Sequence, residues 1–208
     1  MKKVLLALTA LIAIGTLWLY GMNPGEQAAE DMVTITQGGN TITIPRDIAK
    51  EFTPFKDLLE DMGEVTGQEE VIIPLPEYAA TLDAIETIAA IIERIQNNPW
   101  LTRPDGIYIA RRIQPFIDHR LAQKSIQDIN HVIRASIYLE VPYITNGAIR
   151  VAVQKELRRD NNLSVNKIIA TFYPTLPGGL TRESTRFIKP LMPLYKKQYV
   201  LIKKGNVS

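Results

Sequence analysis

Apolar and polar residues alternate in two short stretches near the start of the chain, Val33–Thr36 and Thr41–Ile44. An alternation with a period of two places successive side chains on opposite faces of a β-strand. The four residues between the stretches are Gln-Gly-Gly-Asn, and glycine and asparagine adopt positive φ angles readily. The pattern predicts a β-hairpin, which ends at Pro45 because proline cannot donate a hydrogen bond to a neighbouring strand.

After the hairpin, apolar residues recur mostly at helical spacing, most clearly at Ile85, Ile88 and Ile92. One short apolar stretch, residues 71–75, is predicted to be a third strand. The predicted helices cover residues 47–52, 54–62, 77–96, 126–139, 144–158 and 165–172, and a last one runs from about 182 to 190. Strands that precede a series of helices favour the α+β class over a parallel sheet.

Two stretches lack a clear period. Residues 100–124 contain Pro104 and Pro115, so we predict an irregular connection with some helix. Residues 190–208 carry four lysines and are predicted to form a solvated, partly disordered basic tail. The whole chain has 24 basic and 22 acidic residues, a net charge of only +2, so no overall field favours nucleic acid as a partner.

An uncharged run follows Lys2 and Lys3, and its apolar part spans residues 4–20. This length is short for a transmembrane helix and long for the core of a signal peptide. The two lysines favour an orientation that keeps the N-terminus in the cytoplasm. Residues 1–22 are therefore predicted to be either a signal peptide or a hydrophobic signal-anchor helix, and residues 23–32 a linker. The protein is expected to be exported or membrane-anchored.

Residues suited to catalysis do not form a recognisable motif. The chain has no cysteine, which excludes disulfides and thiolate chemistry. His119 and His131 are not at a metal-ligand spacing, and neither glycine pair (38–39 or 178–179) has the strand–turn–helix context of a phosphate loop. We predict a non-enzymatic protein with no cofactor and no metal, which acts by binding protein partners.

Several short phrases together suggest a family. The first half contains Val33-Thr-Ile-Thr36, Phe55-Lys-Asp-Leu-Leu-Glu-Asp-Met-Gly63 and Ile73-Pro-Leu-Pro76. The second half contains Ile133-Arg-Ala-Ser-Ile-Tyr-Leu-Glu-Val141, Ile168-Ile-Ala-Thr-Phe172 and Leu180-Thr-Arg-Glu183. Their order and spacing resemble the adaptor subunit of SCF ubiquitin ligases, the S-phase-kinase-associated protein family, which has a POZ (BTB) fold.

The resemblance implies a POZ-like domain over residues 33–124 and a C-terminal helical extension over residues 125–189. In the family the first part binds a cullin and the second holds an F-box protein, so the face near Phe55–Met62 is expected to be the cullin side. The resemblance assigns an outward-facing, F-box-type groove to these residues: Ile133, Ile137, Tyr138, Leu139, Val141, Tyr143, Ile144, Ile149, Val153, Ile168 and Phe172. An exported adaptor of this kind would mimic a host adaptor in a foreign cell.

Two other functions stay open. A membrane-tethered POZ-like module could self-associate through the hairpin and the first helices, without any link to ubiquitin. An enzyme of an unrecognised type is the other alternative, and a polar pocket with a perturbed carboxylate or histidine would support it.

Overall fold

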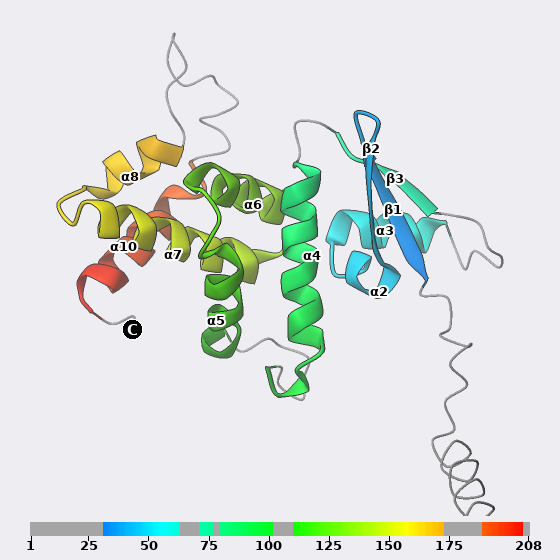
Figure 1. Ribbon diagram of the computed structural model, residues 1–208, viewed down its shortest axis with the longest axis horizontal. Helices are drawn as coiled ribbons and strands as arrows, with labels where there is room; N and C mark the ends of the chain where they lie inside the picture. The colour runs from blue at the N-terminus through cyan, green and yellow to red at the C-terminus, as the bar shows by residue number, and fades with distance from the viewer. Residues whose placement is uncertain (1–30, 63–70, 77–79, 102–109, 173–188, 206–208) are drawn as a thin grey trace, which may run out of the picture. The chain divides into compact units, whose positions relative to one another are not determined.

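The computed structural model describes residues 31–62, 71–76, 80–101, 110–172 and 189–205 (Figure 1). The predicted signal segment, most of the linker and the helix predicted to begin near residue 182 lie outside them. The described residues contain eight α-helices and one three-stranded sheet, which confirms the α+β class. None of these helices is long and apolar enough to cross a lipid bilayer.

The predicted hairpin is confirmed. β1 (Met32–Gln37) pairs antiparallel with β2 (Asn40–Pro45). Gly38 and Gly39 form the turn with φ angles of 55° and 84°, a conformation in which most other residues would be strained. β3 (Val71–Pro74) runs parallel to β1 on its other edge, which gives the strand order β2-β1-β3.

Two short helices connect the hairpin to β3. α2 (Arg46–Ala49) is shorter than predicted, whereas α3 (Thr53–Asp61) has nearly the predicted bounds. Phe52 and Phe55 lie at the start of α3, and their buried rings meet edge to face with centroids 5.6 Å apart. They join the buried side chains of the sheet in one apolar core.

α4 (Leu82–Gln96) is a central helix of the described chain. The hydroxyl of Thr81 caps it by accepting a hydrogen bond from the backbone N–H of Ala84. The buried residues of α4 are Ala84, Ile85, Thr87, Ile88, Ala89, Ile91, Ile92 and Ile95. One side of the helix packs against β1, β2 and α2, and another side packs against α5 and α6 (Figure 1).

The connection predicted to be irregular with some helix contains α5 (Ala110–Leu121), a helix longer and more regular than expected. Ile113, Ile117 and Leu121 recur every four residues and are buried. Pro115 lies inside the helix but is exposed. Its missing N–H therefore leaves a carbonyl unpaired on the solvent side, where water can bind it.

α6 (Ile126–Tyr138) and α7 (Pro142–Arg159) form the most extensively packed helix pair among the described elements. Both have nearly the predicted bounds. Their interface contains one buried polar contact, in which the hydroxyls of Ser136 and Thr145 lie 2.8 Å apart. Each hydroxyl also reaches a backbone carbonyl of its own segment, so burial does not leave either group unsatisfied.

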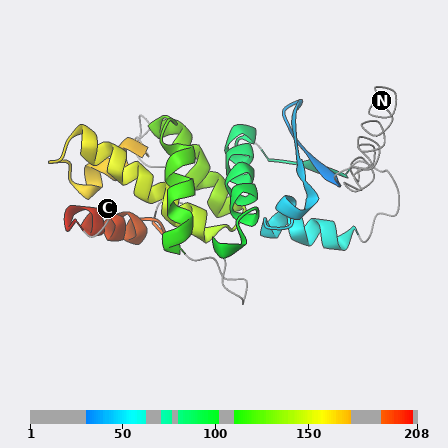
Figure 2. The same cartoon turned by 60° about the horizontal axis from the view of Figure 1, so that its bottom comes forward.

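The basic tail is also helical, which contradicts the prediction of a partly disordered segment. α10 (Met192–Lys203) packs along α7 and near α8 (Val165–Phe172), as Figures 1 and 2 both show. Tyr195 is fully buried, and the hydroxyl of Tyr199 donates to the carbonyl of Leu163. The prediction gave weight to the lysines and missed an apolar stripe. The lysines lie on the exposed face of α10, and the apolar stripe lies on its buried face.

α6 begins with a capping box. Ser125 accepts a hydrogen bond from the backbone N–H of Asp128, and the Asp128 carboxylate accepts one from the backbone N–H of Ser125. The Ser125 hydroxyl also donates to that carboxylate at 2.7 Å, which holds the pKa of Asp128 below its ordinary value of 3.8.

We expect Ser125→Ala and Asp128→Asn each to lower the free energy of unfolding by about 1 kcal/mol at neutral pH. Because the folded protein depresses the pKa of Asp128, this contribution is full above the ordinary pKa and is lost as the pH falls through the folded value. Urea unfolding at neutral and strongly acidic pH tests both statements, with the exposed neighbour variant Gln127→Ala as control. A deficit of Asp128→Asn that does not shrink in acid would contradict the assignment.

Candidate protein-interaction surface

Seven of the eleven residues predicted to line an outward-facing groove lie in the core instead. Their side chains are at most 2% exposed: Ile133, Leu139, Val141, Ile144, Ile149, Val153 and Ile168. The reason is that α6 packs against α4, α7 and α8, while α7 packs against α5, α6 and α10. Each of the two helices thus has several neighbours. Apolar side chains that would face solvent beside a single neighbour are therefore covered by the other helices.

Three of the predicted groove residues keep part of their side chains accessible to solvent. Ile137, Tyr138 and Tyr143 are half-buried and pack against the core from the end of α6 and the start of α7. The eleventh residue, Phe172, ends α8, and its side chain lies outside the described part of the structure. We call Ile137, Tyr138, Tyr143 and the turn between the two helices the corner surface.

The turn of the corner surface has a defined hydrogen-bond geometry. The backbone N–H of Val141 donates to the carbonyl of Ser136 at 2.8 Å, and that of Glu140 donates to Ile137 at 3.1 Å. This pair of bonds is the Schellman motif, which requires a left-handed residue after the helix. Glu140 takes that place with φ 58°, where glycine is the usual residue, and Pro142 then starts α7.

The corner surface is attached to the sheet half of the chain. The backbone N–H of Thr53, the first residue of α3, donates to the carbonyl of Leu139 at 3.3 Å. On the other side, the buried Ser136–Thr145 contact joins the last turn of α6 to the first turn of α7. A partner that binds here would therefore meet a turn fixed by contacts on two sides.

A second apolar surface lies on the sheet half. Ile72 of β3 and Met32 of β1 are 52% and 36% exposed on the sheet face opposite the core. On α3, Leu58 and Met62 lie one helical turn apart and are 38% and 48% exposed. The segment Phe55–Met62, expected to be the cullin side, thus divides into a buried half and an exposed half.

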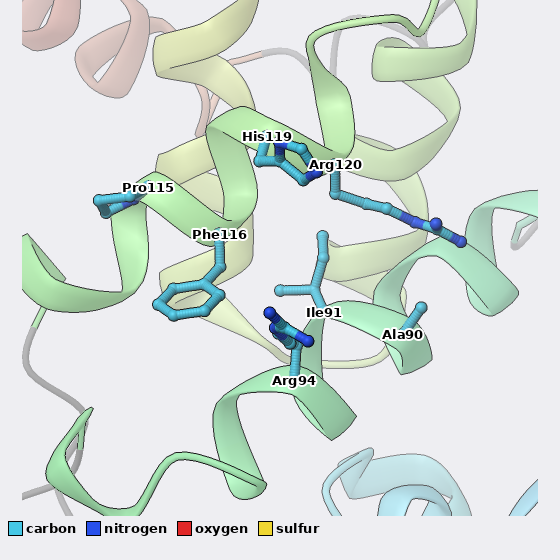
Figure 3. Close-up of a pocket in the computed structure, with 7 residues that line it drawn as sticks. All are labelled: Ala90, Ile91, Arg94, Pro115, Phe116, His119 and Arg120. Atoms are coloured by element: carbon cyan, nitrogen blue, oxygen red, sulfur yellow. The ribbon is translucent and has the colours of Figure 1, made fainter.

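A concave site missed by the sequence reasoning lies between α4 and α5. It encloses about 490 Å³ and is lined by Ala90, Ile91, Arg94, Pro115, Phe116, His119 and Arg120. Phe116 and Arg94 point toward one another from the two helices (Figure 3). The signal that could have revealed it was the four-residue spacing of Ile113, Ile117 and Leu121, which predicts the helix that forms one wall.

The side chains with potential for chemistry are dispersed. His119 lines the α4–α5 pocket, whereas His131 lies on α6, where its charge contributes to the low pKa of Asp128 after the Ser125 hydroxyl and Lys124. Within the described segments, no group of three or more His, Asp or Glu side chains is placed to hold a metal ion.

No protein-family model matches the chain, and no curated protein sequence matches it either. The resemblance to the SCF adaptor family therefore depends on the phrases in the sequence.

Glu140 offers a test of the corner geometry. A non-glycine residue in the left-handed region is strained by roughly 1–2 kcal/mol. Glycine relieves this strain in the folded protein. It also increases the conformational entropy of the unfolded chain, which offsets part of the gain in stability. We expect Glu140→Gly to raise the free energy of unfolding by about 1 kcal/mol, measured by urea denaturation. Glu140→Ala removes the same side chain and keeps the strain, so an equal gain in both variants would contradict a left-handed Glu140.

Proposed function

We propose that the chain is a non-enzymatic adaptor with a POZ-like domain, which binds a partner protein of the F-box type at the corner surface. Two observations support the proposal. A hairpin, two helices and a parallel third strand precede a series of helices, the order that the resemblance implies. The corner surface also keeps predicted groove residues accessible next to a strained turn, and strained backbone is frequent at binding sites.

The side chains of the corner surface suit protein recognition, and this is the observation that carries the proposal. Tyr138 and Tyr143 each keep part of an aromatic side chain accessible, with the Tyr143 hydroxyl turned inward, and tyrosine is enriched in protein interfaces. Ile137, which directly precedes Tyr138 in the chain, adds an aliphatic contact. An amphipathic helix of a partner could place its apolar side chains against such a surface.

An adaptor needs a second surface for the scaffold protein. In this proposal the exposed Leu58 and Met62 of α3 serve that purpose, on the side where the resemblance places the cullin. Thr53 connects α3 to the corner surface through its bond to Leu139, so the two surfaces belong to one connected structure. The targeting segment over residues 4–20 belongs to the same proposal, since export would make the protein a mimic of a host adaptor.

Binding to purified F-box protein and to the N-terminal part of a cullin tests the adaptor role. We expect the immobilised full chain to retain both. We expect Tyr143→Ser to weaken F-box binding roughly thirtyfold, the effect of losing an interface tyrosine of about 2 kcal/mol. Biolayer interferometry measures the dissociation constant.

Tyr199→Ser is the matched control, since it removes another half-buried tyrosine from α10, far along the chain. It should leave F-box binding unchanged, and thermal melting shows whether both variants stay folded. Retention of neither partner would remove the proposal, and an equal loss in both tyrosine variants would remove the assignment to the corner surface.

Self-association is a second candidate function, favoured by the exposed apolar residues Ile72 and Met32 on the open sheet face. β3 is also an edge strand, and edge strands offer unpaired backbone groups to another copy. We expect residues 32–208 to sediment as a dimer if this role is correct.

We expect Ile72→Asp to convert such a dimer to monomer, because a carboxylate in an apolar interface costs several kcal/mol of desolvation. Lys197→Asp, which places the same side chain on the exposed face of α10, is the control. Analytical ultracentrifugation distinguishes the states, and a monomeric wild type at all concentrations would eliminate this function.

A further inference from the structure

A groove lined mainly by cationic and amide side chains runs between α5 and α7. It encloses about 700 Å³. Six of its lining residues carry long cationic or amide side chains: Arg111 and Gln114 from α5, and Arg150, Gln154, Lys155 and Arg158 from α7. It adjoins the α4–α5 pocket, because Pro115 and His119 line both (Figure 3). None of its lining residues belongs to the corner surface or to the exposed apolar residues of the sheet half.

The positive charge of this groove is not neutralised from within. Arg111, Arg150 and Arg158 form no ion pair with an acidic side chain of the described residues, and the half-buried Arg150 has an Nε without an acceptor there. Asp118 is the one carboxylate among the lining residues, and its Oδ1 accepts a hydrogen bond from Gln114 at 2.7 Å. Guanidinium groups bind carboxylates in a planar, two-point arrangement, so this lining favours an anionic ligand.

The walls of the groove are held at a fixed separation. Gly147 lets α5 approach α7 closely, because a Cβ there would lie 2.5 Å from Cδ1 of the buried Ile117. The amine of Lys155 donates to the carbonyls of Ala122 and Lys124, at 2.7 and 2.9 Å, beyond the end of α5. The groove is thus formed before a ligand binds, which reduces the entropy lost on binding.

The spacing of the charges indicates the shape of the ligand. Arg150, Gln154 and Arg158 follow one another at intervals of four residues, so they form a row along α7. Eight residues of helix rise about 12 Å, a distance that about four residues of an extended peptide span. The lining contains no aromatic ring except the imidazole of His119, whereas single-stranded nucleic acid is usually bound by stacking on aromatic side chains.

We propose that the groove between α5 and α7 binds an extended acidic segment of a partner protein, with Arg150 and Arg158 receiving its carboxylates. The site is separate from the corner surface, so its existence does not depend on F-box or cullin binding.

Fluorescence polarisation with the full chain and a short labelled peptide of alternating glutamate and serine tests the proposal. We expect binding that weakens as salt is added, and at least roughly tenfold weaker binding of the same peptide with glutamine in place of glutamate. Arg150→Gln and Arg158→Gln should each weaken binding of the acidic peptide roughly tenfold. Lys197→Gln removes the same charge from α10 and should have no effect.

Arg111→Gln covers the case in which the Arg150 variant fails to fold, because Arg111 is exposed on α5. We expect it to weaken binding about threefold, as for an exposed ion pair. Equal affinity for the glutamate and glutamine peptides would overturn the proposal, as would an equal effect of Lys197→Gln and Arg158→Gln. Displacement of the peptide by equimolar inorganic phosphate would assign the groove to single anions, and tighter binding of single-stranded RNA would assign it to nucleic acid. Either result rejects the acidic-peptide site.

Discussion

Burial of α4 on two sides is the constraint on which the arrangement of this chain depends. Ile85, Ile88, Ile92 and Ile95 are fully buried, and the helix packs against the sheet and α2 as well as against α5 and α6. A buried isoleucine side chain contributes roughly 1.5–3 kcal/mol. The same helix therefore stabilises the small sheet, because packing against a helix makes short strands stable, and it holds the helices that follow.

The candidate surfaces follow from what α4 leaves uncovered. The corner surface lies at the joint between α6 and α7, where backbone bonds to Ser136 and from Thr53 hold a left-handed Glu140. The groove between α5 and α7 is lined by residues of α7 that lie C-terminal to the corner surface. Both are built on helices that pack against a common core, so each surface is a fixed shape and not a loose segment.

The fold could be predicted from the sequence where local signals were sufficient. The glycine pair 38–39 identified the hairpin, and the isoleucine spacing identified α4 and α6. The prediction went wrong where a proline or a run of lysines outweighed an apolar stripe. Because of Pro115 we expected only some helix where α5 is regular, although the proline is exposed and tolerated there, and Lys196 and Lys197 obscured the buried face of α10. Helical spacing alone does not say how many neighbours a helix has, so Ile144 and Ile149 looked equally suited to core and groove.

The position of α10 has a consequence for how the chain is made. This helix leaves the ribosome after α7, yet it packs along α7 and buries Tyr195, and Leu191 just before it is also buried. Until α10 has been synthesised, the side of α7 that it covers lacks this partner, whereas α5 and α6 can already pack against α7. A stop in synthesis before residue 190 would thus leave the part of α7 that α10 covers exposed to solvent, the kind of surface that chaperones and proteases recognise.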